Sequence, residues 1–212
     1  MLTPYGYPTI LKTACIAILL SGAAHLFAKP LLPEALIFSV FLLLFTLYFF
    51  RDPIRTPPDK KRTVLAPADG KVLLVKPVNN HFTGPSSTLV SIFMSPFNVH
   101  VNRIPVDGTV TLLSYHQGTF MMAFDHRSLE SNEKMEIGIE NKELKLHFSQ
   151  VSGFLARRII CSLQQGEQVE RGKRFGMIRF GSRVDVIVPA HVEVTVKAGQ
   201  HTKAGETVIA RF

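Results

Sequence analysis

The candidates for chemistry in this chain are hydroxyl, imidazole and carboxylate side chains that lie far apart in the sequence. Ser182 follows Gly181 and opens an alternating run in which Val184, Val186 and Val188 share one face, so a strand is expected to begin at this serine. A glycine permits backbone conformations that would let the serine hydroxyl approach the carbonyl carbon of the preceding residue. From the residues alone, however, a Gly-Ser pair is most often a turn.

A serine hydroxyl is a weak nucleophile and needs an adjacent base that a third group orients. His100 is a candidate base, although its place between Val99 and Val101 also suits a polar member of a strand at 99–101. Asp69 is a candidate orienting group, although Asp-Gly is a favoured hairpin turn, and Gly70 follows it. From the residues alone, the simpler interpretation is that His100 is a polar residue of a strand and Asp69 a residue of a turn.

Composition excludes several classes of site. The histidines show no recurrent ligand spacing, and the two cysteines, Cys15 and Cys161, lie in unrelated segments, so neither a metal site nor a disulfide framework is expected. The net charge of +8 suits an acidic partner such as anionic lipid or nucleic acid. Nucleic acid is disfavoured because no basic stripe interleaved with aromatic residues occurs.

The N-terminal quarter of the chain predicts a membrane helical hairpin. Residues 10–28 and 35–50 are strongly apolar and are joined by a short proline-containing turn at 29–34. Each run is at or just below the roughly 20 residues that cross a bilayer, so full spans and shallow re-entrant segments both remain open. Five basic residues at 51–62 place the following domain on the cytoplasmic side of a cell membrane.

The remainder predicts a mostly β domain. A proline-rich basic linker at 51–62 separates the hairpin, 1–50, from short β-branched runs broken by glycine and proline, 63–212. Two segments, 166–172 and 199–205, each hold glycines six apart around a polar turn, as in the barrel-like sandwiches of lipoyl and biotinyl carrier domains. Lys173 and Lys203 lie near these turns, but neither stands at the centre of a symmetric turn as a modified carrier lysine would.

Several motifs in register resemble one family. The chain is similar to the short, archaeal-type branch of the phosphatidylserine decarboxylase proenzymes over nearly its whole length. The matching segments are Phe-Arg-Asp-Pro at 50–53, Val-Leu-Ala-Pro-Ala-Asp-Gly-Lys-Val at 64–72, Phe-Met-Ser-Pro-Phe-Asn-Val-His-Val-Asn-Arg-Ile-Pro-Val-Asp-Gly at 93–108, and Gly172 to Arg179 followed by Phe-Gly-Ser-Arg-Val-Asp-Val at 180–186.

The resemblance implies that the chain cuts itself. Ser182 would attack the Gly181 carbonyl, and β-elimination of the resulting ester would release a β chain, 1–181, from an α chain, 182–212, that begins with a covalent pyruvoyl group. His100 would be the base and Asp69 its orienting group. The sequence departs from longer bacterial members, which have a second histidine where Arg103 stands and a Leu-Gly-Ser-Thr processing site.

The same resemblance implies the reaction. The pyruvoyl carbonyl would react with the amine of phosphatidylserine in the membrane and take up the electrons left by carbon dioxide, with no soluble cofactor. His100 would supply the proton that completes phosphatidylethanolamine. A non-enzymatic membrane-tethered adaptor or carrier, which would keep its Gly181-Ser182 bond, is the alternative. The sequence does not decide whether the chain forms a homo-oligomer.

Overall fold

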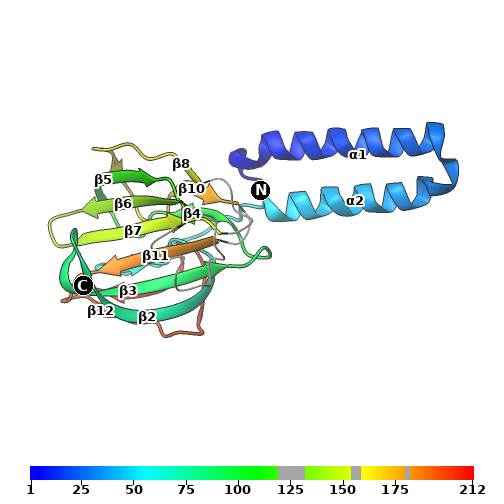
Figure 1. The fold of residues 1–212 in the computed structure, drawn as a ribbon. Coiled ribbons are helices and arrows are strands. Elements are labelled where there is room, and N and C mark those ends of the chain that lie inside the picture. The colour runs from blue at the N-terminus through cyan, green and yellow to red at the C-terminus, as the bar shows by residue number, and fades with distance from the viewer. Residues whose placement is uncertain (119–131, 154–158, 180–181) are drawn as a thin grey trace. The chain divides into compact units, whose positions relative to one another are not determined.

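The computed structural model describes residues 1–118, 132–153, 159–179 and 182–212 (Figure 1). The chain divides into two compact units, Met1–Ile54 and Arg55–Phe212. The boundary between them falls inside the segment predicted as a linker.

The first unit is an antiparallel helical hairpin. A 3-10 turn, η1 (Pro4–Gly6), leads into α1 (Tyr7–Phe27), and a second, η2 (Lys29–Leu31), leads into α2 (Leu32–Phe49). Ser39 Oγ on α2 donates a hydrogen bond to the Ala17 carbonyl on α1 at 3.3 Å. The proline at the start of each helix suits a position whose amide has no partner within the helix.

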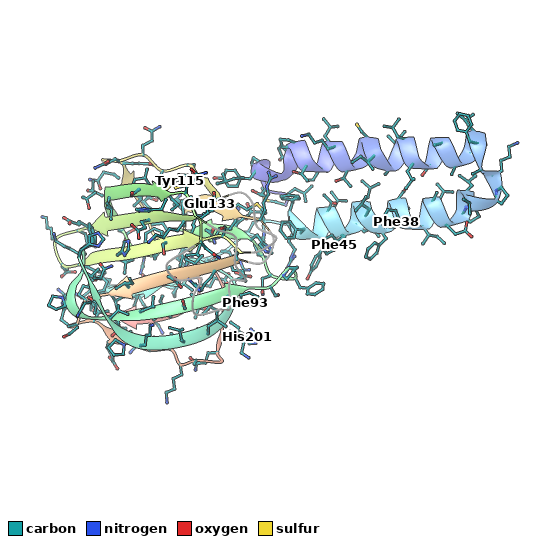
Figure 2. The ribbon with its side chains drawn as sticks, in the orientation of Figure 1. Phe38, Phe45, Phe93, Tyr115, Glu133 and His201 are labelled. Carbon is teal, nitrogen blue, oxygen red and sulfur yellow. The ribbon has the colours of Figure 1, made fainter. Side chains whose placement is uncertain are left out.

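The surface of this hairpin is apolar nearly all round. Figure 2 shows Phe38 and Phe45 projecting from α2. Phe38 and most of the large apolar side chains of both helices are exposed, and Phe45 is partly buried. The segments Pro4–Phe27 and Lys29–Phe49 are long and apolar enough to cross a membrane. A hairpin with this surface is suited to membrane association, because in water it would expose a large apolar area.

The second unit is built from antiparallel strands, as Figure 1 shows. Its eight-stranded, strongly curved sheet has the order β13-β2-β3-β11-β7-β6-β5-β9, and two three-stranded sheets have the orders β4-β10-β8 and β1-β14-β12. The strand bounds are β1 (Thr63–Leu65), β2 (Gly70–Asn80), β3 (Gly84–Met94), β4 (Val101–Arg103), β5 (Gly108–His116), β6 (Lys134–Glu140), β7 (Lys145–Val151), β8 (Ile159–Cys161), β9 (Gln168–Val169), β10 (Arg174–Ile178), β11 (Ser182–Val188), β12 (Glu193–Val194), β13 (His201–Thr202) and β14 (Val208–Arg211).

One face of the large sheet carries the apolar core. Val90 and Ile92 on β3, Val184 on β11 and Leu146 and Phe148 on β7 are fully or almost fully buried in it. These residues alternate along each strand with residues on the opposite face, which is the pattern of a sheet that covers a core on one side. The predicted mostly β domain, preceded by an apolar helical hairpin, is confirmed.

The glycine repeats occupy turns, as predicted. Gly166 and Gly172 have φ values of +85° and +79°, and Gly199 and Gly205 have φ values of +92° and +73°. Glycine is favoured at such positions because a Cβ would be strained there. The predicted single turn in each segment is wrong, because each glycine lies in its own turn and a two-residue strand, β9 or β13, lies between the glycines of each pair.

One predicted strand was misplaced. The strand expected at 99–101 is instead β4, Val101–Arg103, so His100 precedes the strand and does not belong to it. The cause is a turn after β3, in which Asn98 Oδ1 accepts hydrogen bonds from the Ser95 amide at 2.8 Å and the Ser95 hydroxyl at 2.7 Å. This turn delays the extended conformation by two residues.

Candidate active site

Ser182 is the first residue of β11, and its side chain is fully buried on the core face. It stands opposite Met94, the last residue of the antiparallel neighbour β3. Its hydroxyl donates a hydrogen bond to the Met94 thioether sulfur at 3.4 Å. Because a thioether is a weak acceptor, this contact orients the hydroxyl without binding it strongly.

His100 is also fully buried. Its Nδ1 lies 2.9 Å from the carbonyl oxygen of Asn98. A carbonyl can only accept, so Nδ1 carries the proton, and the neutral imidazole keeps a lone pair on Nε2. The ring is therefore in the tautomer that a general base at Nε2 requires.

The turn after β3 and strand β4 bring His100 to the same end of the sheet as Ser182. Met94 Sδ, which accepts from Ser182, also lies 3.8 Å from Asn102 Nδ2, two residues beyond His100. From the other side, the Ile178 amide at the end of β10 donates to the His100 carbonyl at 3.4 Å. Both the nucleophile and the candidate base are thus placed by β3, β4 and β10.

Asp69 is buried just before β2. Its Oδ2 accepts from Arg55 Nη2 at 2.8 Å and its Oδ1 accepts from the Ala204 amide at 2.7 Å. Arg55 also reaches Glu206, so this arginine of the predicted linker is packed on the β domain. A charged guanidinium and a backbone amide are thus among the groups that hold the carboxylate.

The backbone beside Asp69 approaches β3 very closely. A Cβ added to Gly70 would lie 2.1 Å from the Phe93 carbonyl oxygen, a contact that no side chain can make. Lys71 and Phe93 are the last paired residues of β2 and β3, and Gly70 and Met94 are the next residues along these two strands. Asp69 is therefore anchored at the end of the sheet that holds Ser182, and its action on His100 stays a prediction.

Two other expectations concern neighbouring positions. Gly181, the other half of the predicted scissile bond, lies outside the described residues. Arg103, which stands where longer relatives have a second histidine, is buried, and its Nη1 donates to the Gly172 carbonyl at 2.8 Å. In the described residues no group of three or more His, Cys, Asp or Glu side chains is arranged to hold a metal ion.

Sequence reasoning missed three residues of this region. Met94, Asn102 and Gln150 are buried and connected, because Gln150 Nε2 donates to Asn102 Oδ1 at 2.9 Å and Asn102 reaches Met94. One signal was available for Gln150. It follows Leu146 and Phe148 at the period of a strand, so a polar residue interrupts a buried apolar face.

Comparison with known proteins now decides the family. The family model described as phosphatidylserine decarboxylase matches residues 42–210. The chain belongs to the phosphatidylserine decarboxylase family. This membership confirms the family resemblance that the sequence motifs indicated.

Named relatives match from end to end. The chain is 58% identical over 212 residues to the phosphatidylserine decarboxylase proenzyme of Chlorobium phaeobacteroides (strain DSM 266), with all of both chains covered. It is 59% identical over 214 residues to the proenzyme of the same name from Pelodictyon phaeoclathratiforme, again with all of both chains covered. With the proenzyme from Chlorobaculum tepidum it shares 53% identity over 213 residues, covering 99% of this chain and 97% of that one.

Proposed function

We propose that this chain is a phosphatidylserine decarboxylase that makes its own catalytic group by cutting the bond between Gly181 and Ser182. The products are a β chain, 1–181, and an α chain, 182–212, which remain together as one enzyme. The observation that carries the proposal is the buried Ser182 hydroxyl, which donates to a weak sulfur acceptor at the end of the sheet to which the turn after β3 also brings His100. Family membership supports the same reaction.

The cleavage uses groups of the chain itself. The Ser182 hydroxyl attacks the preceding carbonyl carbon and passes its proton to His100 Nε2, which returns it to the amine as the peptide C–N bond breaks. The resulting ester then loses the Ser182 Cα proton and its Cβ–Oγ bond, which releases the carboxylate of residue 181. Water replaces the nitrogen left on the new chain end, and ammonia departs, leaving a pyruvoyl group.

The residues present fit such a group. Ser182 opens a strand, so scission places the new chain end on β11 and leaves the rest of that strand paired with β3 and β7. When formed, the pyruvoyl group supplies an electrophilic carbonyl that reacts with an amine and takes up electrons as carbon dioxide leaves. His100 Nε2 is the group of this chain that we assign to proton transfer in decarboxylation.

The apolar hairpin supports a substrate that stays in the bilayer. We propose that it anchors the enzyme in the cell membrane, with the β domain on the cytoplasmic side, as the basic residues at 51–62 indicate. Tethering confines enzyme and phosphatidylserine to the same surface and raises their effective concentration. The basic segment also attracts anionic lipid, by about 1 kcal/mol for each Lys or Arg near the surface.

Intact mass spectrometry of the purified protein tests the proposal. We expect two polypeptides, 1–181 and 182–212, the smaller without a free amine, and conversion of phosphatidylserine to phosphatidylethanolamine. The Ser182→Ala protein should remain one chain and be inactive. An adaptor would leave the wild-type chain whole, so an uncut wild-type protein, or an active Ser182→Ala protein, would refute the proposed function.

A further inference from the structure

The core face of β7 changes from apolar to polar at the end next to Ser182. Leu146 and Phe148 belong to the hydrophobic core, and Gln150 follows them at the next alternate position on the same face. Ser152, directly after the end of β7, continues this alternation. Both polar side chains are fully buried. The decarboxylase mechanism described above uses neither of them.

The position of Ser152 is fixed by its backbone. Its amide donates to the Glu133 carbonyl at 2.9 Å, and its carbonyl accepts from Asn132 Nδ2 at 2.8 Å. The Glu133 side chain is itself held by the Tyr115 hydroxyl at 2.7 Å, and Figure 2 shows these two side chains together. The backbone of Ser152 is therefore hydrogen-bonded to the segment that leads into β6.

The strand register sets Ser152 against Ser182. Strands β7 and β11 are neighbours in the sheet (Figure 1), and their paired residues end with Arg183 and Val151. Ser152 directly follows β7 and Ser182 precedes Arg183, so the same register, continued by one residue, sets Ser152 opposite Ser182. Both side chains are on the core face, where directly opposite Cβ atoms are about 5 Å apart. The register thus puts Ser152 beside the reacting residue.

Gln150 has a fixed orientation. Its Nε2 donates to Asn102 Oδ1 at 2.9 Å and to the Ile160 carbonyl at 3.3 Å. Since both partners are acceptors, the amide nitrogen must face them, and Oε1 faces elsewhere as an acceptor. Oε1 of Gln150 and Oγ of Ser152 have no hydrogen-bond partner within the parts of the chain that the structure describes.

A buried polar atom without a hydrogen-bond partner is destabilising. Most such atoms in native proteins therefore form a hydrogen bond to water or to a bound ligand. A hydroxyl that can donate, next to the reacting residue, and a carbonyl oxygen that can accept, two positions away on the same face, match a molecule with a carboxylate and an amine. The serine head group of phosphatidylserine has both. Resting on the proposed function, we propose that Ser152 and Gln150 bind this head group, Ser152 donating to its carboxylate and Gln150 Oε1 accepting from its amine.

The product lacks the carboxylate, and this difference makes the assignment testable. In mixed micelles of phosphatidylserine and nonionic detergent, Ser152→Ala should raise the KM roughly tenfold, the cost of one hydrogen bond to a charged group. Inhibition by phosphatidylethanolamine should stay unchanged. Gln150→Met should weaken the binding of both lipids, because both have the amine.

Readouts other than activity separate binding from folding and processing. Ser152→Ala should be cut completely into its two chains, and its Tm should be no lower than that of the wild type, because the substitution removes an unpaired buried hydroxyl. The matched control is Ser87→Ala on β3. Ser87 is also fully buried, but its hydroxyl donates to the Gly84 carbonyl at 2.8 Å, so its loss should lower the Tm and leave the KM unchanged.

The outcomes separate this inference from the proposed function. An unchanged KM in Ser152→Ala would overturn the inference, as would an equal rise in the KM and in the phosphatidylethanolamine inhibition constant. Blocked scission in Ser152→Ala would also overturn it, because the residue would then act in processing. A wild-type protein that is neither cut nor active would instead refute the proposed function.

Discussion

The hydroxyl of Ser182 and the sulfur of Met94 face each other at 3.4 Å across the β11–β3 pair. The nucleophile of the proposed cleavage is thus kept in place by one of the weakest acceptors that proteins contain. A stronger acceptor would keep the hydroxyl proton and oppose its transfer to a base.

Met94→Leu should therefore preserve self-cleavage. The substitution conserves volume, so we expect the free energy of unfolding to fall by less than about 1.5 kcal/mol. Scission, followed by gel electrophoresis after expression, should be at least as fast as in the wild type because the hydroxyl loses its acceptor. A Met94→Leu protein that folds but stays uncut would show that the sulfur contact is required for cleavage.

Asn98→Ala should slow scission without abolishing it. The substitution removes the acceptor of the two Ser95 hydrogen bonds and loosens the turn whose carbonyl orients His100, at a cost of about 1–2 kcal/mol in stability. His100→Ala should be slower still because it removes the base. The control is Phe97→Ala in the same turn, where the side chain is 67% exposed. Equal rates in all three variants and the wild type would remove His100 from the mechanism.

Arg55→Met should destabilise the β domain. It leaves the Asp69 carboxylate buried without its guanidinium, a change that typically costs about 3–5 kcal/mol. Adding Asp69→Asn removes the buried negative charge. The double variant should therefore recover part of the lost free energy of unfolding, as measured by urea denaturation. Scission in the double variant then isolates the role of Asp69. Normal cleavage there would mean that this carboxylate is structural.

Acid should weaken the fold through His147. Burial first, and then the charges of His81 and Lys134, lower the pKa of His147 to about 4, while Glu136 partly opposes them. Asn80 reinforces this effect. Its Oδ1 accepts from the Phe82 and Thr83 amides, so its Nδ2 must donate to His147 Nδ1 at 3.1 Å, an atom that protonation would turn into a second donor.

The direction follows from the lowered pKa. In the unfolded chain His147 has a pKa near the usual ~6.5, so between pH ~6.5 and pH ~4 it binds a proton that the folded protein does not bind. The contribution of His147 to the free energy of unfolding is therefore complete above pH ~6.5 and falls towards pH ~4, by up to about 3 kcal/mol. His147→Gln can accept the same hydrogen bond and does not titrate, so its stability should depend less on pH in this window. The exposed His201 on β13 (Figure 2) provides the control, since His201→Gln should keep the wild-type slope.

Local sequence patterns were sufficient to predict most helices, strands and turns. The apolar helical hairpin, the strand that begins at Ser182 and the location of the repeat glycines in turns could all be predicted, because alternation, apolar length and positive-φ preferences act within a few residues. The strand near His100 was misplaced because a side-chain hydrogen bond from Ser95 to Asn98 outweighs the strand preference of the valines on either side.

The sequence by itself determined the two kinds of element, the family and the residues that could react. Only the tertiary structure decided which of these residues lie close together in space. Pairing β11 with β3 on one side and β7 on the other brings Met94, Ser182 and Ser152 into one row, although about 30 residues or more separate each from the next along the chain. Register between distant strands depends on the packing of whole faces, so no local pattern contains it.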